Sequence, residues 1–259
     1  MRIADIIAAI ETTAPLFAAA PWDVSGMQVA ARRTEITRLA VCLDPLPGQI
    51  RAAAALGADM VLSHHPLLLK ARLPSRLDGY HETLSLLFRH DMPLYAAHTS
   101  LDANPHGPAG WVARLLKLSG TEILEQTAEK EGRVYGFGFC GEIAPRTLDQ
   151  ILDMLRPHIS LDNAMLCGRP APDSIRRIAC CPGSGASLLG EAARLGADLY
   201  ITGDVKYHTA LDAELCVLDV GHHSLEEEMM RRFARELSRN LSGTEVVFLP
   251  SGSPFHRVH

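Results

Sequence analysis

Short apolar runs alternate with amphipathic segments along the first part of the chain. The runs at 38–44, 58–64 and 92–98 have the length and aliphatic content of buried strands. Segments 48–57 and 81–90 lie between them and carry the spacing of amphipathic helices. Strands that alternate with helices are joined by crossover connections, so the pattern predicts an α/β fold with a mostly parallel sheet.

The rest of the chain continues this alternation. Further helices are predicted at 3–19 (interrupted near Pro15), 110–118, 147–159 and 187–196, and further strands at 134–143, 163–170, 175–181, 197–203 and 214–223. The polar segment 127–133 predicts a loop or a domain boundary.

Two pairs of segments indicate an internal duplication. LGADMVLSHH (56–65) aligns with LGADLYITGD (195–204), and HTSLD (98–102) aligns with HHSLE (222–226). Both matches occur in the same order, and each follows a comparable predicted strand. The chain is therefore predicted to contain two similar α/β domains, at 1–125 and 126–259, with functional residues in the cleft between them.

Histidines and carboxylates gather where these strands are predicted to end. The residues are His64 and His65, then His98 and Asp102, and in the second copy His222, His223 and Glu226. Ligands of parallel sheets bind at the carboxyl ends of the strands. Adjacent strand residues point to opposite faces, so His64 and His65 would serve two different ions. Imidazole and carboxylate groups suit Zn, Fe, Mn or Co, and a carboxylate is the natural bridge between two ions.

A single histidine at a strand end is more often a polar residue without a metal. The His-His pair together with two His-x-x-x-carboxylate segments favours a metal site. His223 is predicted to point away, because His222 carries the repeated spacing.

Glu226 is expected in the first turn of a helix. Ser224 and Glu227 have the spacing of a capping box, which predicts a helix N-cap at Ser224. Apolar residues at every fourth position predict the buried stripe of this helix: Leu225, Met229, Phe233 and Leu237.

Composition narrows the function classes. Of 259 residues, 47% are hydrophobic and 21% charged, which is typical of a soluble globular protein. The net charge of −5 argues against a nucleic-acid surface, and the pairs Arg176-Arg177 and Arg231-Arg232 are expected on solvated faces. The six cysteines form no C-x-x-C motif and predict reduced thiols in a cytoplasmic protein. No apolar run approaches the ~20 residues that a membrane span needs.

Six motifs in order resemble the Nif-three-like family, the dinuclear metal centre proteins also labelled GTP cyclohydrolase I type 2 homologues. The motifs are WDVSGMQV (22–29), SHHPLL (63–68), HTSLDA (98–103), GSG (183–185), ITGDVKYH (201–208) and GHHSLEE (221–227). The resemblance implies two similar α/β domains with a two-metal site in the interdomain cleft, and a toroidal homohexamer.

The resemblance also implies which residues hold the metals. His65 and Asp102 would hold one ion, His64 and His222 the other, and Glu226 would bridge them. His98 matches a position beside the site and is a candidate outer ligand. One departure is Ser100, where the family commonly has asparagine.

The predicted function is metal-dependent hydrolysis of a nucleotide-like, pterin-like or phosphorylated small molecule. Two ions bridged by Glu226 would share a water and lower its pKa, and His98 or Asp204 would assist as acid or base. Glu226 and His98 are therefore the candidate catalytic residues. Lys206 and His208 either meet an anionic substrate or belong to a solvated loop.

Two alternatives remain open at this point. The glycine-rich loop 180–187 could bind phosphate through its amides, although a tight structural turn is favoured. The protein could also be non-enzymatic, as a metal storage, delivery or sensing protein or as a ring-shaped interaction partner.

Overall fold

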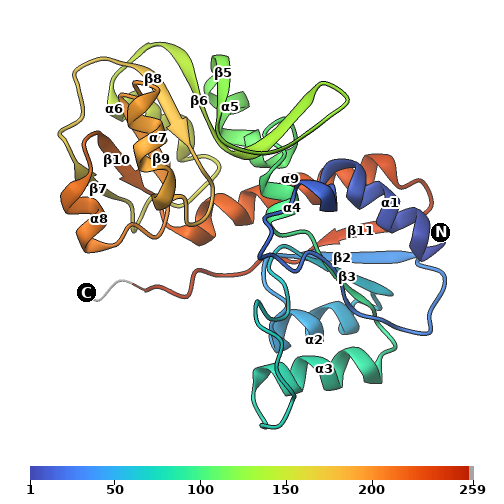
Figure 1. The fold of residues 1–259 in the computed structure, drawn as a ribbon. Helices are drawn as coiled ribbons and strands as arrows, with labels where there is room; N and C mark the ends of the chain where they lie inside the picture. The colour runs from blue at the N-terminus through green and yellow to red at the C-terminus, as the bar shows by residue number, and fades with distance from the viewer. Residues whose placement is uncertain (257–259) are drawn as a thin grey trace. The chain divides into compact units, whose positions relative to one another are not determined.

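The computed structural model describes residues 1–256, and its strands form two separate sheets (Figure 1). The chain divides into two compact units. Unit 1 consists of Met1–Leu101 and Met230–Gly252, and unit 2 consists of Asp102–Met229 with the residues from Ser253 onward. The predicted α/β class is confirmed. The division into domains 1–125 and 126–259 describes continuous segments and stays a prediction.

Unit 1 is built on a five-stranded sheet in the order β1-β4-β3-β2-β11. Its strands are β1 (Gly26–Val29), β2 (Arg38–Cys42), β3 (Met60–Ser63), β4 (Leu94–Ala96) and β11 (Glu245–Phe248). Strands β4, β3, β2 and β11 are parallel, and β1 is antiparallel to β4. Because β2 and β3 are covered on both faces, they are almost continuously buried and mostly apolar, as parallel strands generally are.

Helices cover both faces of this sheet. They are α1 (Ile3–Thr13), the 3-10 turn η1 (Leu16–Ala18), α2 (Pro47–Ala55), α3 (Gly79–Arg89) and the C-terminal part of α9 (His222–Asn240). In Figure 1, α2 and α3 lie on one face, and α1 and α9 lie on the other. The short helix α4 (Thr99–Asp102) follows β4 and leads from unit 1 into unit 2.

Unit 2 contains a six-stranded sheet in the order β5-β6-β8-β9-β10-β7. Its strands are β5 (Ser119–Lys130), β6 (Arg133–Arg146), β7 (Met165–Gly168), β8 (Ile175–Cys180), β9 (Leu199–Thr202) and β10 (Cys216–Asp219). The central strands β8, β9 and β10 are parallel, and the flanking strands are antiparallel. The remaining elements are η2 (Pro108–Gly110), α5 (Trp111–Leu116), α6 (Leu148–Leu155), η3 (Ala186–Leu188), α7 (Leu189–Arg194) and α8 (Tyr207–Asp212).

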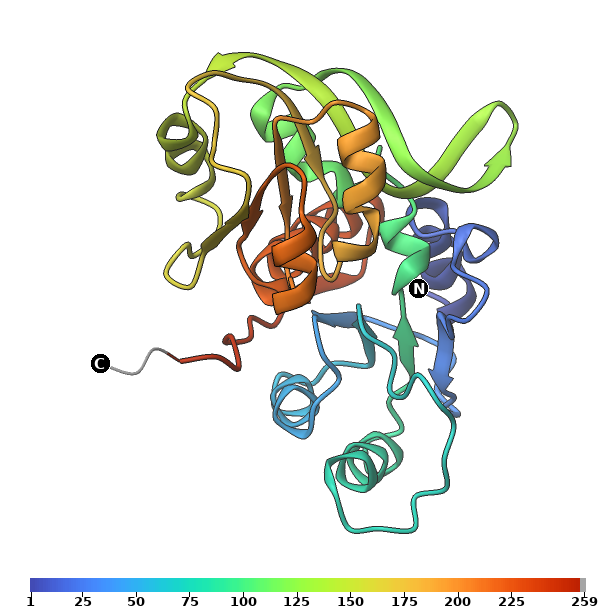
Figure 2. The same cartoon turned by 60° about the vertical axis from the view of Figure 1, so that its left-hand side comes forward.

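The loop predicted at 127–133 is wrong, because this segment is the tip of a long hairpin formed by β5 and β6 (Figure 2). Glu131 and Gly132 have φ values of 54° and 75° and form its two-residue turn. Positive φ at both turn positions matches the twist of the flanking strands. The hairpin is polar here because its end is exposed, not because the strands have stopped.

The start of α9 also differs from the prediction. The helix begins at His222, so Ser224 lies inside the first turn and is not the N-cap. The Ser224 hydroxyl instead donates to Ser160 O at 3.4 Å. The expected buried stripe is confirmed, since Leu225, Met229 and Phe233 are fully buried and Leu237 is almost so.

Matching hydrogen bonds in the two units support the internal duplication. In unit 1, Asp59 N donates to Arg38 O at 2.8 Å, and Arg38 N donates to Asp59 Oδ2 at 3.0 Å. In unit 2, Asp198 and Arg177 exchange the same two bonds at 2.8 and 2.9 Å. Both aspartates follow the helix that precedes a central strand, and each ties that strand to its neighbour.

Near the candidate site, the sheet hydrogen bonds of the two copies differ by one residue from the sequence alignment. Ala97 N donates to Ser63 O in unit 1, and Val220 N donates to Thr202 O in unit 2. Position 98 therefore corresponds to Gly221 in the sheet register, and His222 lies one residue further along. Gly221 has a φ of 80°, a conformation that glycine adopts readily.

The helices within residues 1–256 are all too short or too polar to cross a lipid bilayer.

Candidate metal centre

Three histidines of unit 1 converge at the carboxyl ends of two adjacent parallel strands. His64 and His65 follow β3, and His98 follows β4. Each of them offers a ring nitrogen, and the three atoms lie within 4.8 Å of one another. We call these residues the imidazole cluster. Their convergence follows from the parallel pairing of β3 with β4, which brings two strand ends to one edge of the sheet.

The rings of His64 and His65 are each held through Nδ1. His64 is fully buried, and its Nδ1 lies 2.8 Å from Ala97 O. His65 Nδ1 lies 2.7 Å from Asp44 Oδ1. A carbonyl or carboxylate oxygen accepts a hydrogen bond from Nδ1–H, so each ring carries its lone pair on Nε2.

His98 is held in the same way by a buried carboxylate. Its Nδ1 lies 2.7 Å from Asp23 Oδ1, and Asp23 also accepts hydrogen bonds from Ser25 Oγ and from Thr99 N and Oγ1. Burial alone would raise the pKa of Asp23, but the hydrogen bonds from His98, Ser25 and Thr99 outweigh it and hold that pKa well below its ordinary value. Asp23 therefore stays ionised and keeps the proton of His98 on Nδ1.

Unit 2 contributes a second group, Asp102, His222 and Glu226, which we call the acid cluster. Asp102 and Glu226 each offer an oxygen within 4.8 Å of the other. His222 and Glu226 are four residues apart on α9, so both side chains lie on one face of the helix, and His222 Nε2 is 2.8 Å from Glu226 Oε2. Glu226 is only 4% exposed, which places an acidic group where an apolar one would ordinarily pack.

His222 is oriented by a second carboxylate. Its Nδ1 lies 2.7 Å from Asp204 Oδ2, so His222 bridges Asp204 and Glu226. Burial would lower the pKa of His222, but the hydrogen bonds and charges of Glu226 and Asp204 outweigh it and raise the pKa to about 9. Asp204 has a φ of 57°, a left-handed conformation that aspartate tolerates better than most residues.

The glycine-rich loop 180–187 packs against the acid cluster as a structural turn. Gly183 has a φ of 69°, and a Cβ at this position would come within 2.0 Å of Glu226 Oε1. Gly185 N donates to Thr202 Oγ1, and the Tyr200 hydroxyl donates to Gly185 O. The loop is thus anchored to β9, and Gly183 leaves the space that the Glu226 carboxylate occupies.

The residues present fit divalent metal ions. All four histidines of the two clusters hold Nδ1 against an oxygen acceptor. In His64, His65 and His98 this arrangement leaves the lone pair on Nε2 for a ligand, as is usual for metal-binding histidines, whereas His222 Nε2 faces Glu226. Carboxylates complete the donor set in Asp102 and Glu226. Nitrogen and oxygen donors of this kind suit first-row divalent cations.

Sequence reasoning missed two of the carboxylates that orient the histidines. Asp44 lies two residues after the end of β2, and a carboxylate at a third strand end of the same sheet edge was the available signal. Asp23 lies in a loop before β1, and only its place in the WDVSG motif marked it. Asp204 was anticipated as an acid or base, whereas here it holds Nδ1 of His222.

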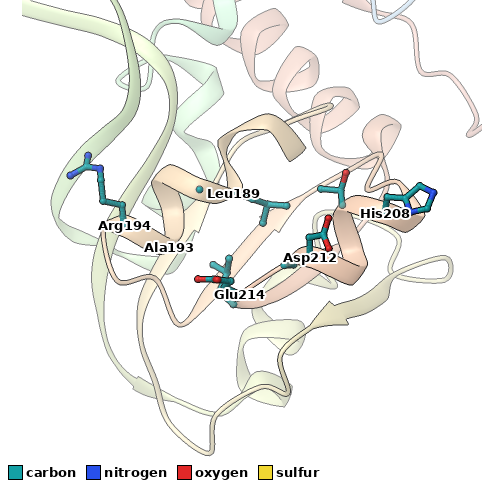
Figure 3. A pocket seen from close by; sticks show the side chains of 10 residues that line it. Leu189, Ala193, Arg194, His208, Asp212 and Glu214 are labelled. Carbon is teal, nitrogen blue, oxygen red and sulfur yellow. The ribbon is translucent and has the colours of Figure 1, made fainter.

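Other candidates from the sequence lie apart from the clusters. His223 Nε2 lies 3.9 Å from Glu227 Oε2 and joins neither cluster. His208 lines a separate hollow of about 720 Å³ between α7 and α8, beside Leu189 and Asp212 (Figure 3). Ser100 is fully buried, and within residues 1–256 its hydroxyl has no hydrogen-bond partner.

Comparison with known proteins identifies relatives that match this chain along nearly its whole length. The family model Duf34/NIF3 (NGG1p interacting factor 3) matches residues 1–254. Curated relatives from Streptococcus pneumoniae and Clostridium perfringens, both named GTP cyclohydrolase 1 type 2 homolog, are each 30% identical to this chain. The first alignment covers 100% of both chains, and the second covers 97% of this chain and 96% of the relative.

Solved structures show the same fold. HcgD from Methanocaldococcus jannaschii, in its reduced form, matches with a TM-score of 0.83 and 29% identity over 96% of this chain and 98% of that one. A Bacillus cereus protein related to NIF3 matches with a TM-score of 0.88 and 20% identity over 100% and 99%. The similarity covers the whole chain and the fold as well as the motifs, and this protein belongs to the Duf34/NIF3 family.

Proposed function

We propose that the imidazole cluster and the acid cluster together hold two divalent cations and that this site hydrolyses a small phosphorylated or heterocyclic molecule. The observation that carries the proposal is that every histidine of the two clusters has its Nδ1 bound by an oxygen acceptor. A hydrogen bond at Nδ1 fixes the orientation of the ring and favours the tautomer in which Nε2 can bind a metal ion.

The proposed ligand assignment follows the family pattern. His65 and Asp102 would hold one ion and His64 and His222 the other, and Glu226 would be shared by both. The connection between the two clusters is short in sequence, because Asp102 follows His98 by only four residues through α4. A helix rises about 1.5 Å per residue, so this connection spans only about 6 Å along its axis.

Divalent ions at this site would act as Lewis acids and lower the pKa of a coordinated water. The chain's own residues would supply the rest. Asp23 keeps the His98 proton on Nδ1, which leaves Nε2 to accept a proton from the attacking water. Gly183 keeps space for the carboxylate of Glu226 and so fixes its orientation.

The substrate class is proposed from the relatives. The curated relatives carry the name GTP cyclohydrolase 1 type 2 homolog, which favours a nucleotide or another nitrogen heterocycle as substrate. A toroidal homohexamer and a cytoplasmic location are likewise proposed from the family resemblance.

The test measures metal content and turnover in the same preparations. The purified protein is loaded with Fe, Zn, Mn or Co, its metal content per chain is determined by mass spectrometry, and it is screened against nucleotides and phosphoesters. We expect two metal equivalents and turnover with at least one substrate. Glu226→Gln should lose turnover and metal while its circular dichroism spectrum stays that of the wild type.

The exposed Glu214 provides a matched control, because Glu214→Gln makes the same change outside both clusters. His98→Ala should keep most of the metal and lose turnover by about 100-fold or more. Full metal loading without turnover on any substrate would refute hydrolysis. Unchanged turnover in Glu226→Gln would refute the assigned site.

A further inference from the structure

A narrow groove runs between helix α9 and the edge strand β11 of unit 1. Arg231, Arg235 and Arg239 of α9 line one wall, and Val246 and Phe248 of β11 line the other. Its volume is about 580 Å³. Figure 1 shows this part of α9 running along β11. The groove lies wholly within unit 1 and shares no residue with the imidazole cluster or the acid cluster.

The groove concentrates positive charge on an otherwise acidic protein. The three arginines recur at every fourth position, so they form one stripe along α9, and no carboxylate is among the described residues that line the groove. The chain as a whole carries a net charge of −5. Glu245, the acidic residue of β11, is drawn to the other face of the sheet, where its Oε2 lies 2.8 Å from Arg38 Nη2.

One wall of the groove also offers backbone hydrogen-bonding groups. Strand β11 ends the order of its sheet and pairs with β2 on one side only. Glu245 N and Leu249 N donate to β2 and the loop before it. Because successive strand residues point their N–H and C=O groups to opposite sides, those of Val246 and Phe248 point to the open edge.

An aromatic ring lies at one end of the groove. The Arg231 guanidinium lies over the Phe248 ring, 4.7 Å from its centroid. This stacking holds the guanidinium in a defined position beside the strand. Pro250 follows β11 and has no N–H, so an added strand would pair along β11 and stop there.

We propose that this groove binds an extended acidic peptide segment of a partner protein, which pairs with β11 as an additional strand and places alternate carboxylates against the arginine stripe. The spacings agree. Arginines four residues apart are about 6 Å apart along a helix axis, and alternate residues of a strand are about 6.6 Å apart. Strand addition of this kind obtains affinity from the main chain and specificity from alternate side chains.

Nucleic acid is the competing occupant, because a phosphate backbone also complements a row of arginines. The open edge of β11 favours the peptide, since its N–H and C=O groups match those of another strand and have no counterpart in a phosphate backbone. A third alternative is that the arginine stripe binds no partner and only prevents other strands from pairing with β11, as charged residues at sheet edges commonly do. Each of these alternatives makes a different experimental prediction.

The test uses a short fluorescent peptide in which glutamates alternate with valines, titrated with the full-length protein and followed by anisotropy. We expect saturable binding that weakens with added salt. Arg239→Glu should weaken it by about tenfold or more. Arg89→Glu is the matched control, because Arg89 is also an exposed arginine in the last turn of a helix of unit 1 and should bind as the wild type does.

A second probe isolates the backbone contribution. The same peptide N-methylated at alternate residues keeps its charge but cannot donate hydrogen bonds to β11, and it should bind about tenfold more weakly or worse. Equal binding of the methylated peptide, or tighter binding of a single-stranded DNA of equal charge, would overturn the proposal. Absence of peptide binding at low salt would also overturn it and would favour edge protection.

Discussion

Gly183 lies so close to Glu226 that no larger residue fits between them. A Cβ on residue 183 would come within 2.0 Å of Glu226 Oε1 and 3.1 Å of its Cδ. The backbone at Gly183 is also left-handed, with a φ of 69°. The Glu226 carboxylate can therefore occupy this position only because residue 183 is a glycine.

We predict that Gly183→Ala displaces the Glu226 carboxylate and lowers metal affinity by about tenfold or more. Strain from the left-handed backbone should add a loss of about 1–3 kcal/mol in unfolding free energy. Gly196→Ala separates the two effects, because Gly196 has a φ of 71° with open space around its Cβ direction. The control should lose stability and keep metal affinity, and equal metal affinity in both variants would contradict the predicted crowding.

Asp23 is predicted to position His98 through the proton on Nδ1. Asp23→Asn should reduce turnover strongly, because an amide can donate to Nδ1 and favour the other tautomer. The pH–rate profile is the distinguishing measurement, since loss of a correctly oriented base changes the shape of the profile and a simple loss of stability does not. Asp5→Asn removes an exposed carboxylate of the same unit and should leave the profile unchanged.

Asp59 is predicted to make part of the stability of unit 1 depend on pH. Burial would raise the pKa of Asp59, but hydrogen bonds from Thr37 and Arg38 and the charge of Arg33 outweigh it and lower the pKa. Because the folded-state pKa lies below the unfolded one, the stabilisation is present above the unfolded pKa and is lost as the pH falls through the folded pKa.

Denaturant unfolding of Asp59→Asn at several pH values tests this prediction. The stability difference from the wild type should be largest near neutral pH and should shrink as the solution becomes acidic. The exposed Asp173 serves as the control, and Asp173→Asn should differ little from the wild type at any pH. A difference for Asp59→Asn that does not change with pH would contradict the assignment.

Two leucines in the segment after the imidazole cluster are expected to lie in a subunit interface. Leu73 and Leu77 are 81% and 91% exposed, which is unusual for large apolar side chains so close together. If the proposed homohexamer forms, burial of these side chains would stabilise it. Leu73→Ser with Leu77→Ser should shift the mass measured by light scattering toward smaller assemblies, whereas Leu211→Ser, at another exposed leucine, should not.

Much of the fold was predictable because its signals are local. Strands such as β2 and β3 are mostly apolar runs, and helices such as α2 and α3 show amphipathic spacing. The predictions of the loop at 127–133 and of the N-cap at Ser224 were wrong, because in both places the local sequence fits more than one structure. The polar tip of the β5–β6 hairpin resembled a loop, and the Ser224 signal suggested a cap two residues inside the actual start of α9.

The alignment of HTSLD with HHSLE matched residues that do not occupy equivalent backbone positions in the two units. The sheet hydrogen bonds pair Ala97 with Ser63 and Val220 with Thr202, which shifts His98 against His222 by one residue. Sequence similarity alone could not reveal this, because strand register depends on pairing with a distant strand.

The amino-acid sequence by itself determined the α/β class, the repeated unit, the family and the identity of the candidate ligands, because these follow from periodicity, composition and motifs. Only the tertiary structure decided that β11, from the end of the chain, completes the first sheet beside β2. It also decided that Asp44, Asp23 and Asp204 orient the histidines and that Gly183 leaves room for Glu226. These relationships join residues far apart in the chain, and no local pattern encodes which distant groups folding will bring together.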